Sequence, residues 1–128
     1  MSEPYLRPIS STWWLQKRNY TLFMVRELTA VFIVAFLVFF LLWLAKLGQG
    51  AEVYSAFLQS LSSPGWILFN LVVLAAALYH TVTFFNAAGK AIVVHRGEEP
   101  LPPAFIVGPN YVAWVVVSVV ILWIVLRS

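Results

Sequence analysis

The chain has 128 residues, of which 62% are hydrophobic and only 10% are charged. A soluble domain carries about 25% charged residues, and it needs them to cover its surface. The net charge of +3 comes from basic residues scattered between apolar blocks, which form no basic face. The composition therefore excludes a soluble enzyme, a nucleic-acid-binding domain and a disordered tail, and it predicts a protein of the lipid bilayer. Because cysteine is absent, the chain itself holds no disulfide and no thiolate-bound iron–sulfur cluster.

The first element expected along the chain is a cytoplasmic segment over residues 1–19, followed by a first membrane span over about 20–47. The N-terminal segment holds no apolar stretch resembling a signal-peptide core, so no cleavage is expected. The stretch from Leu28 to Ala45 contains no charged residue, and about 20 apolar residues suffice for a helix to cross a bilayer. Asn19 is a suitable N-cap for a helix that starts before this stretch.

Two further spans are expected, over about 65–89 and 105–126. The second follows the turn signal Ser-Ser-Pro-Gly. Gly89 and Lys90 offer it a stop, although the helix could also extend to Gly97. The third follows a proline-rich segment that cannot be helical throughout. Pro109 is expected either to kink this third helix or to mark its true start.

The direction of the helices follows from the basic residues that flank them, because cytoplasmic segments carry an excess of Lys and Arg. Only Lys46 and Arg127 lie on the side of the first loop and the C-terminus. The opposite side holds six basic residues, namely Arg7, Lys17, Arg18, Arg26, Lys90 and Arg96. We therefore predict an all-α membrane protein of three transmembrane helices, one domain over residues 1–128, with a cytoplasmic N-terminus and a periplasmic C-terminus.

Ionisable residues inside the expected spans are the best candidates for function, since a charge at the bilayer centre costs on the order of 3 kcal/mol. Glu27 lies nine residues beyond Arg18, about 13 Å along a helix. His80 lies ten residues before Lys90 on the antiparallel helix, about 15 Å by the same rise. The carboxylate and the imidazole are therefore expected at a similar depth below the cytoplasmic surface.

The side chains near Glu27 and His80 suggest what kind of molecule could bind at this depth. Arg26 and Glu27 are adjacent and point about 100° apart on a helix, so each is expected to find partners on other helices. Thr83 and Phe84 lie three and four residues after His80 and share its helix face. An imidazole, a hydroxyl and an aromatic wall on one face would suit a flat ring with polar oxygens.

Each of these residues also has a purely structural interpretation. Arg26 lies near enough to the interface to extend its side chain to the headgroups. Glu27 could form an ion pair or hydrogen bond with a neighbouring protein, His80 an interhelical hydrogen bond, and Phe84 simple packing. The shared depth favours the functional interpretation of the set.

Haem and other metal ligation are not expected. Only His80 and His95 exist, about 22 Å apart along a continuous helix, and so they cannot both ligate one haem if that helix continues. A haem shared with another protein through His80 has no support in the sequence.

Three segments, in this order, resemble the family of fumarate reductase membrane anchors known as the C subunits. They are Pro-Tyr-Leu-Arg-Pro-Ile-Ser-Ser-Thr-Trp-Trp at 4–14, Met-Val-Arg-Glu-Leu-Thr-Ala-Val at 24–31, and Asn-Leu-Val-Val-Leu-Ala-Ala-Ala-Leu-Tyr-His-Thr at 70–81. The length of the chain is also usual for that family. The likeness thins out in the third span and in both loops.

The resemblance implies a role in the inner membrane of a bacterium during anaerobic respiration. In that family, the C subunit pairs with a second hydrophobic anchor of three helices, and the two attach an iron–sulfur protein and a flavoprotein to the membrane. Menaquinol is oxidised within the anchor, and its electrons pass through the iron–sulfur clusters to FAD, which reduces fumarate. The chain would thus be a subunit of a quinol:fumarate reductase or succinate dehydrogenase that carries no flavin of its own, and the four-subunit form has no haem.

The resemblance also assigns the quinone site. The family places a Glu and an Arg of the first helix and a His of the second around the quinone, at positions that match Glu27, Arg26 and His80. Glu27 would be the catalytic group that accepts protons, and Arg26 would stabilise negative charge on a quinone oxygen. The family pattern has a Lys and then a Trp where this sequence has Val82 and Phe84. Phe84 keeps the aromatic wall but offers no indole N–H.

Two other functions are compatible with the composition. A small proton-coupled multidrug transporter binds cationic substrates at one membrane Glu in its first helix, although such transporters have four spans. A purely structural anchor would bind no ligand. Co-purification of a flavin-containing partner would distinguish the fumarate reductase anchor from a transporter that forms a homodimer.

Overall fold

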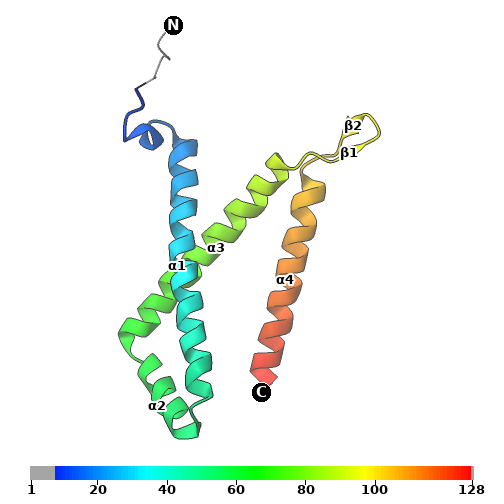
Figure 1. Ribbon diagram of the computed structural model, residues 1–128. Helices are drawn as coiled ribbons and strands as arrows, with labels where there is room; N and C mark the ends of the chain where they lie inside the picture. Colours follow the sequence, from blue (N-terminus) through cyan, green and yellow to red (C-terminus); the bar gives the residue numbers. More distant parts are fainter. Residues whose placement is uncertain (1–7, 128) are drawn as a thin grey trace, which may run out of the picture. The chain divides into compact units, whose positions relative to one another are not determined.

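Three long helices dominate the computed structural model, which describes residues 8–127 (Figure 1). They are α1 (Arg18–Leu47), α3 (Pro64–Ala91) and α4 (Ala104–Arg127), and all are long and apolar enough to cross a membrane. Even the shortest, with 24 residues, would measure about 36 Å against a hydrocarbon core of about 30 Å. The predicted class, an all-α membrane protein with three transmembrane helices, is confirmed. The direction in which the helices cross stays a prediction.

The described chain forms two compact units, with their boundary inside α3. The first extends through His80, and the second begins at Thr81. The first unit contains most of the residues expected to be functional.

The start of α1 differs from the expectation, because Asn19 is not its N-cap. The helix begins at Arg18, two residues earlier than a cap at Asn19 would place it, and its N-cap is Lys17, whose backbone is extended and whose side chain makes no capping bond. A short 3-10 helix, η1 (Trp13–Leu15), holds this end instead. The hydroxyl of Thr21 donates a hydrogen bond of 3.0 Å to the backbone oxygen of Trp14. This contact ties η1 to the first turn of α1.

A fourth helix, α2 (Ala51–Leu61), lies between the first two spans, where the sequence suggested only a loop. Gly50 precedes it with a φ of +103°, a conformation that glycine adopts without strain. Trp43 of α1 donates its indole N–H to the hydroxyl of Tyr54 at 3.1 Å. Phe57 of α2 faces the same part of α1, with its ring centroid 6.1 Å from that of Phe39. The helix is therefore held to the end of α1.

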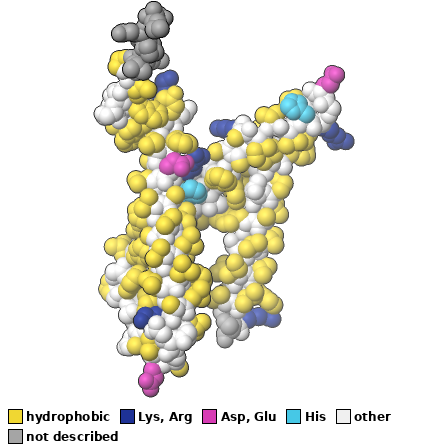
Figure 2. Space-filling model, viewed as in Figure 1, with side chains coloured by type: hydrophobic (Ala, Val, Ile, Leu, Met, Phe, Trp, Pro, Cys, Tyr) yellow, Lys and Arg dark blue, Asp and Glu magenta, His cyan; other side chains and the backbone are white. Residues whose placement is uncertain are grey.

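The core of the first unit is a cluster of aromatic rings around Phe39. The described part of the chain buries only three apolar side chains, those of Phe39, Val73 and Ala76, which are 5%, 6% and 8% exposed. The rings with centroids 4.6 to 6.3 Å from that of Phe39 are those of Phe36, Trp43, Phe57, Trp66 and Phe69. Most other apolar side chains of the spans are left for lipid or partner proteins to cover, as the largely hydrophobic surface in Figure 2 illustrates.

The second unit contains a β-hairpin that the sequence did not predict. Its strands are β1 (His95–Arg96) and β2 (Glu99–Pro100), which pair antiparallel. Gly97 has a φ of +71° and opens the two-residue turn between them. The backbone N–H of Leu101 donates to the oxygen of Val94 at 2.8 Å, which extends the pairing by one bond. Strands of two residues carry too little alternation to be recognised in a sequence.

Pro109 lies inside α4, so it does not mark the start of that helix. The helix begins at Ala104, five residues earlier. A polar contact joins it to the end of α3, since Asn86 donates its amide N–H to the hydroxyl of Tyr111 at 3.2 Å. That hydroxyl donates in turn to the backbone oxygen of Val82 at 3.4 Å. Such interhelical bonds satisfy polar groups that find no water in a bilayer.

Gly89 lies inside the last turn of α3, which continues to Ala91 and so ends between the stop at Gly89 and the possible extension to Gly97. The glycine is buried where α3 and α4 approach each other. A Cβ at this position would overlap Cγ2 of Val107 and lie 3.3 Å from the backbone oxygen of Pro103. Gly89 therefore serves close packing of two helices, a common use of small residues in membranes.

Replacing Gly89 with alanine is expected to lower the free energy of unfolding by about 2 kcal/mol, because the added methyl overpacks the contact with Val107 and Pro103. The control is Gly65→Ala in the same helix, where a Cβ meets nothing within 4 Å. Unfolding of the full chain in mixed micelles, followed by helical circular dichroism, measures both variants. Adding Val107→Ala should restore part of the loss. Equal stability of Gly89→Ala and Gly65→Ala would contradict this account.

Candidate functional site

The candidate site lies in the first unit, where α3 carries a histidine against the polar turn of α1. Nδ1 of His80 lies 3.1 Å from Oγ1 of Thr29 and 3.3 Å from the backbone oxygen of Arg26. The imidazole is therefore at the level of Arg26 and its neighbour Glu27, the relation that residue counting suggested. Figure 2 shows an acidic, a basic and a histidine side chain meeting on an otherwise hydrophobic surface.

Arg26 and Glu27 pair with each other, and the expectation that each would seek a partner on another helix is wrong. Nη2 and Nε of Arg26 lie 2.8 and 3.1 Å from Oε1 of Glu27. The Cα–Cβ bonds of adjacent residues do diverge by about 100° on a helix. The arginine side chain is nevertheless long enough to turn around the helix surface, and no competing ligand for either charge lies among the described residues nearby.

The ion pair exposes its two members unequally. The side chain of Arg26 is 16% exposed, with its guanidinium carbon 4.7 Å from the ring centroid of Phe23. The side chain of Glu27 is 53% exposed. The carboxylate is therefore the outermost polar group of the site, open to a small molecule or a protein that approaches α1 within the membrane. Charged residues within transmembrane helices are almost always paired, and the guanidinium of Arg26 is the partner here.

Thr29 completes the polar set, and the sequence alone did not identify it. Its hydroxyl donates to the backbone oxygen of Arg26, one turn earlier in α1, and the same hydroxyl oxygen contacts His80. Hydroxyl residues often form such back-bonds inside helices. The available signal was a hydroxyl inside an apolar stretch, three residues after Arg26.

The remaining predicted site residue, Phe84, belongs to the second unit. It follows His80 by four residues in α3, and its side chain is 54% exposed. The structure therefore shows an aromatic side chain on α3 one turn beyond the imidazole. A part for Phe84 in the same site as Arg26 and Glu27 stays a prediction.

The two histidines do not share one continuous helix, which was the condition for excluding haem on distance. α3 ends at Ala91, and His95 lies in β1. The distance of about 22 Å along a helix therefore does not apply to His80 and His95. The absence of haem stays a prediction from the resemblance.

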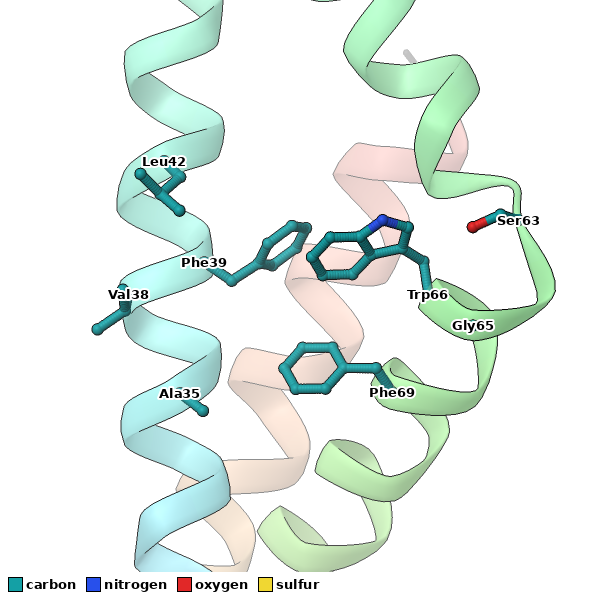
Figure 3. Close-up of a pocket in the computed structure, with 8 residues that line it drawn as sticks. All are labelled: Ala35, Val38, Phe39, Leu42, Ser63, Gly65, Trp66 and Phe69. Carbon is teal, nitrogen blue, oxygen red and sulfur yellow. The ribbon is translucent and has the colours of Figure 1, made fainter.

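A separate cavity of about 510 Å³ lies at the other end of α1, beside the aromatic cluster (Figure 3). Phe39 stands twelve residues after Glu27, about 18 Å along the helix. Trp66 and Phe69 of α3 form the opposite wall. The full lining consists of Ala35, Val38, Phe39, Leu42, Ser63, Gly65, Trp66 and Phe69. None of the described residues that line this cavity has an ionisable side chain, so this lining provides no group for proton transfer.

Comparisons with known proteins agree over nearly the whole chain. A sequence model of the family described as the C subunit of fumarate reductase matches residues 1–126. A fumarate reductase C subunit of Mycobacterium tuberculosis (strain H37Rv) is 34% identical over 122 residues, which cover 95% of this chain and 97% of the relative. One of Salmonella agona (strain SL483) is 40% identical over 124 residues, which cover 97% of this chain and 95% of the relative.

Proposed function

Because this chain belongs to the family of fumarate reductase C subunits, we propose that it forms part of the menaquinol oxidation site of a fumarate reductase. Membership supports a role as membrane anchor. In the proposal, the chain and a second hydrophobic anchor protein hold an iron–sulfur protein and a flavoprotein at the cytoplasmic face of the bacterial inner membrane. The N-terminus is cytoplasmic, as the basic flanks suggest.

The observation that carries the proposal is the set of polar groups at one level of α1 and α3. A carboxylate, a guanidinium and an imidazole lie together on Glu27, Arg26 and His80, inside helices that are otherwise apolar. A quinol is a flat ring with two hydroxyl groups and an apolar tail. The residues present fit such a molecule, because the polar groups match its oxygens and the exposed Leu28 and Phe23 offer apolar surface nearby.

The chemistry of the bound menaquinol is the release of two electrons and two protons, and the chain contributes the groups that handle the protons. Glu27 accepts a proton at its carboxylate, whose Oε1 lies 2.8 Å from Nη2 of Arg26. Arg26 also stabilises negative charge on a nearby oxygen. His80 makes a hydrogen bond to a ring oxygen from α3. The iron–sulfur clusters and the FAD of the partner proteins would supply the route for the electrons to fumarate.

Assembly can be tested by purification from membranes that contain all four proposed proteins of the complex. The chain is expected to co-purify with a flavin and with iron–sulfur clusters, and menaquinol should drive fumarate reduction by that complex. Without the chain, the flavoprotein and the iron–sulfur protein should appear in the soluble fraction and accept electrons only from a reduced dye. A homodimer that carries neither flavin nor iron would contradict the proposal and favour the transporter hypothesis.

A further inference from the structure

Two oxygen atoms lie within hydrogen-bond distance of Nδ1 of His80. Oγ1 of Thr29 is 3.1 Å from Nδ1, and the backbone oxygen of Arg26 is 3.3 Å from it. The hydroxyl of Thr29 already donates to that same backbone oxygen. Because a hydroxyl has a single hydrogen, Oγ1 has only lone pairs left for the imidazole.

Both neighbours of Nδ1 are therefore hydrogen-bond acceptors. An unprotonated Nδ1 would point its lone pair at the lone pairs of Thr29 and of the Arg26 carbonyl, with no hydrogen between them. A protonated Nδ1 donates to both. A neutral imidazole carries one N–H, so its other nitrogen, Nε2, is then the basic one.

We propose that Thr29 is a positioning residue that holds His80 in the Nδ1–H tautomer and so makes Nε2 a hydrogen-bond acceptor. This inference rests on the proposed function, in which His80 contacts a ring oxygen of menaquinol. An acceptor nitrogen matches the hydroxyl group of a quinol, whereas the carbonyl oxygen of a quinone has no hydrogen to offer it. Thr29 thereby biases the site toward the reduced form of its substrate.

The protonation state can be measured without any enzyme activity. The chain has only two histidines, so in His95→Asn, labelled with ¹⁵N at histidine only, His80 gives the sole imidazole signals in the NMR spectrum of the full chain in lipid bilayers. At neutral pH, Nδ1 should carry the proton. Thr29→Val, which removes the hydroxyl but keeps the shape, should lower the ratio of the two tautomers about fivefold, the effect of one ordinary hydrogen bond. Thr29→Ser, which keeps the hydroxyl, should retain the ratio.

Two results would overturn the inference. One is a proton on Nε2 of His80 in the unmodified chain, a result that needs no folded variant. The other is the same tautomer ratio in Thr29→Val as in Thr29→Ser, which would show that the hydroxyl has no influence on His80.

Kinetics of the assembled complex separate this inference from the proposed function. Thr29→Val should lower kcat/KM for menaquinol about fivefold and leave dye-driven fumarate reduction unchanged, with Thr29→Ser close to the unmodified complex. It should also weaken the preference for menaquinol over menaquinone in competition. A changed tautomer with unchanged menaquinol kinetics would refute a role of His80 in quinol oxidation, whereas an unchanged tautomer refutes only the positioning role of Thr29.

Discussion

Glu27→Gln is expected to lower menaquinol-driven fumarate reduction by about 100-fold, the usual contribution of a general base. The glutamine keeps an oxygen for the guanidinium of Arg26, so the hydrogen bonds now measuring 2.8 and 3.1 Å can persist. It cannot accept a proton at neutral pH. Fumarate reduction with a soluble dye as donor should be unchanged, because that route bypasses the membrane site. Parallel assays of one purified complex with both donors make the measurement.

A matched control separates the role of Glu27 from a general effect of charge removal. Glu52 lies in the first turn of α2, outside the three spans, and is exposed. Glu52→Gln should therefore leave both activities intact. Equal losses with both donors in Glu27→Gln would indicate failed assembly, and unchanged menaquinol activity would remove Glu27 from the mechanism.

The features that sequence reasoning predicted well are those that depend on regular helices. Apolar stretches and their charged flanks located the three spans, because a helix of fixed rise must match the thickness of a bilayer. The same rise placed Glu27 and His80 at one level, where the structure brings His80 to 3.3 Å from the backbone oxygen of Arg26. Counting residues works here because each helix is continuous past the site.

The features that were missed depend on side-chain reach and on contacts between elements. The diverging Cβ atoms of Arg26 and Glu27 argued against an ion pair between them. The arginine side chain is nevertheless long enough to reach the carboxylate of Glu27. Gly89 resembles a helix stop in the sequence, and only Val107, eighteen residues later, shows that close packing requires a glycine there. Thr29 gains its importance from His80, 51 residues away in the chain.

The sequence of α2 does contain a pattern that predicts a helix. Apolar side chains recur at positions 53, 54, 57, 58 and 61, the spacing of one helix face, between a glycine and a Ser-Ser-Pro-Gly turn. Its eleven residues are too few to span a bilayer, which is why a search for spans passes over them. The aromatic partners Phe57 and Tyr54 then tie this helix to α1.

Phe39 takes part in this contact between α1 and α2. Replacing Phe39 with alanine is expected to cause the largest loss of stability in the chain. Phe39 is 5% exposed, and its ring is stacked on Trp66 with centroids 4.6 Å apart. Removing the ring would enlarge the neighbouring cavity of about 510 Å³ and separate α1 from both α2 and α3. The free energy of unfolding should fall by about 3 kcal/mol, as for buried aromatic residues elsewhere.

The adjacent residue Phe40 is the control, because it has the same side chain on the same helix but is 41% exposed. Its ring pairs with Trp43 at 6.4 Å, and lipid can replace most of its other contacts. Phe40→Ala should therefore cost less than about 1 kcal/mol, near the value of a single aromatic pair. Unfolding of the full chain in mixed micelles, followed by tryptophan fluorescence, reports both values because Trp66 senses the loss of its stacking partner. Equal destabilisation by the two substitutions would mean that the aromatic cluster does not hold the first unit together, and that general hydrophobicity of α1 does.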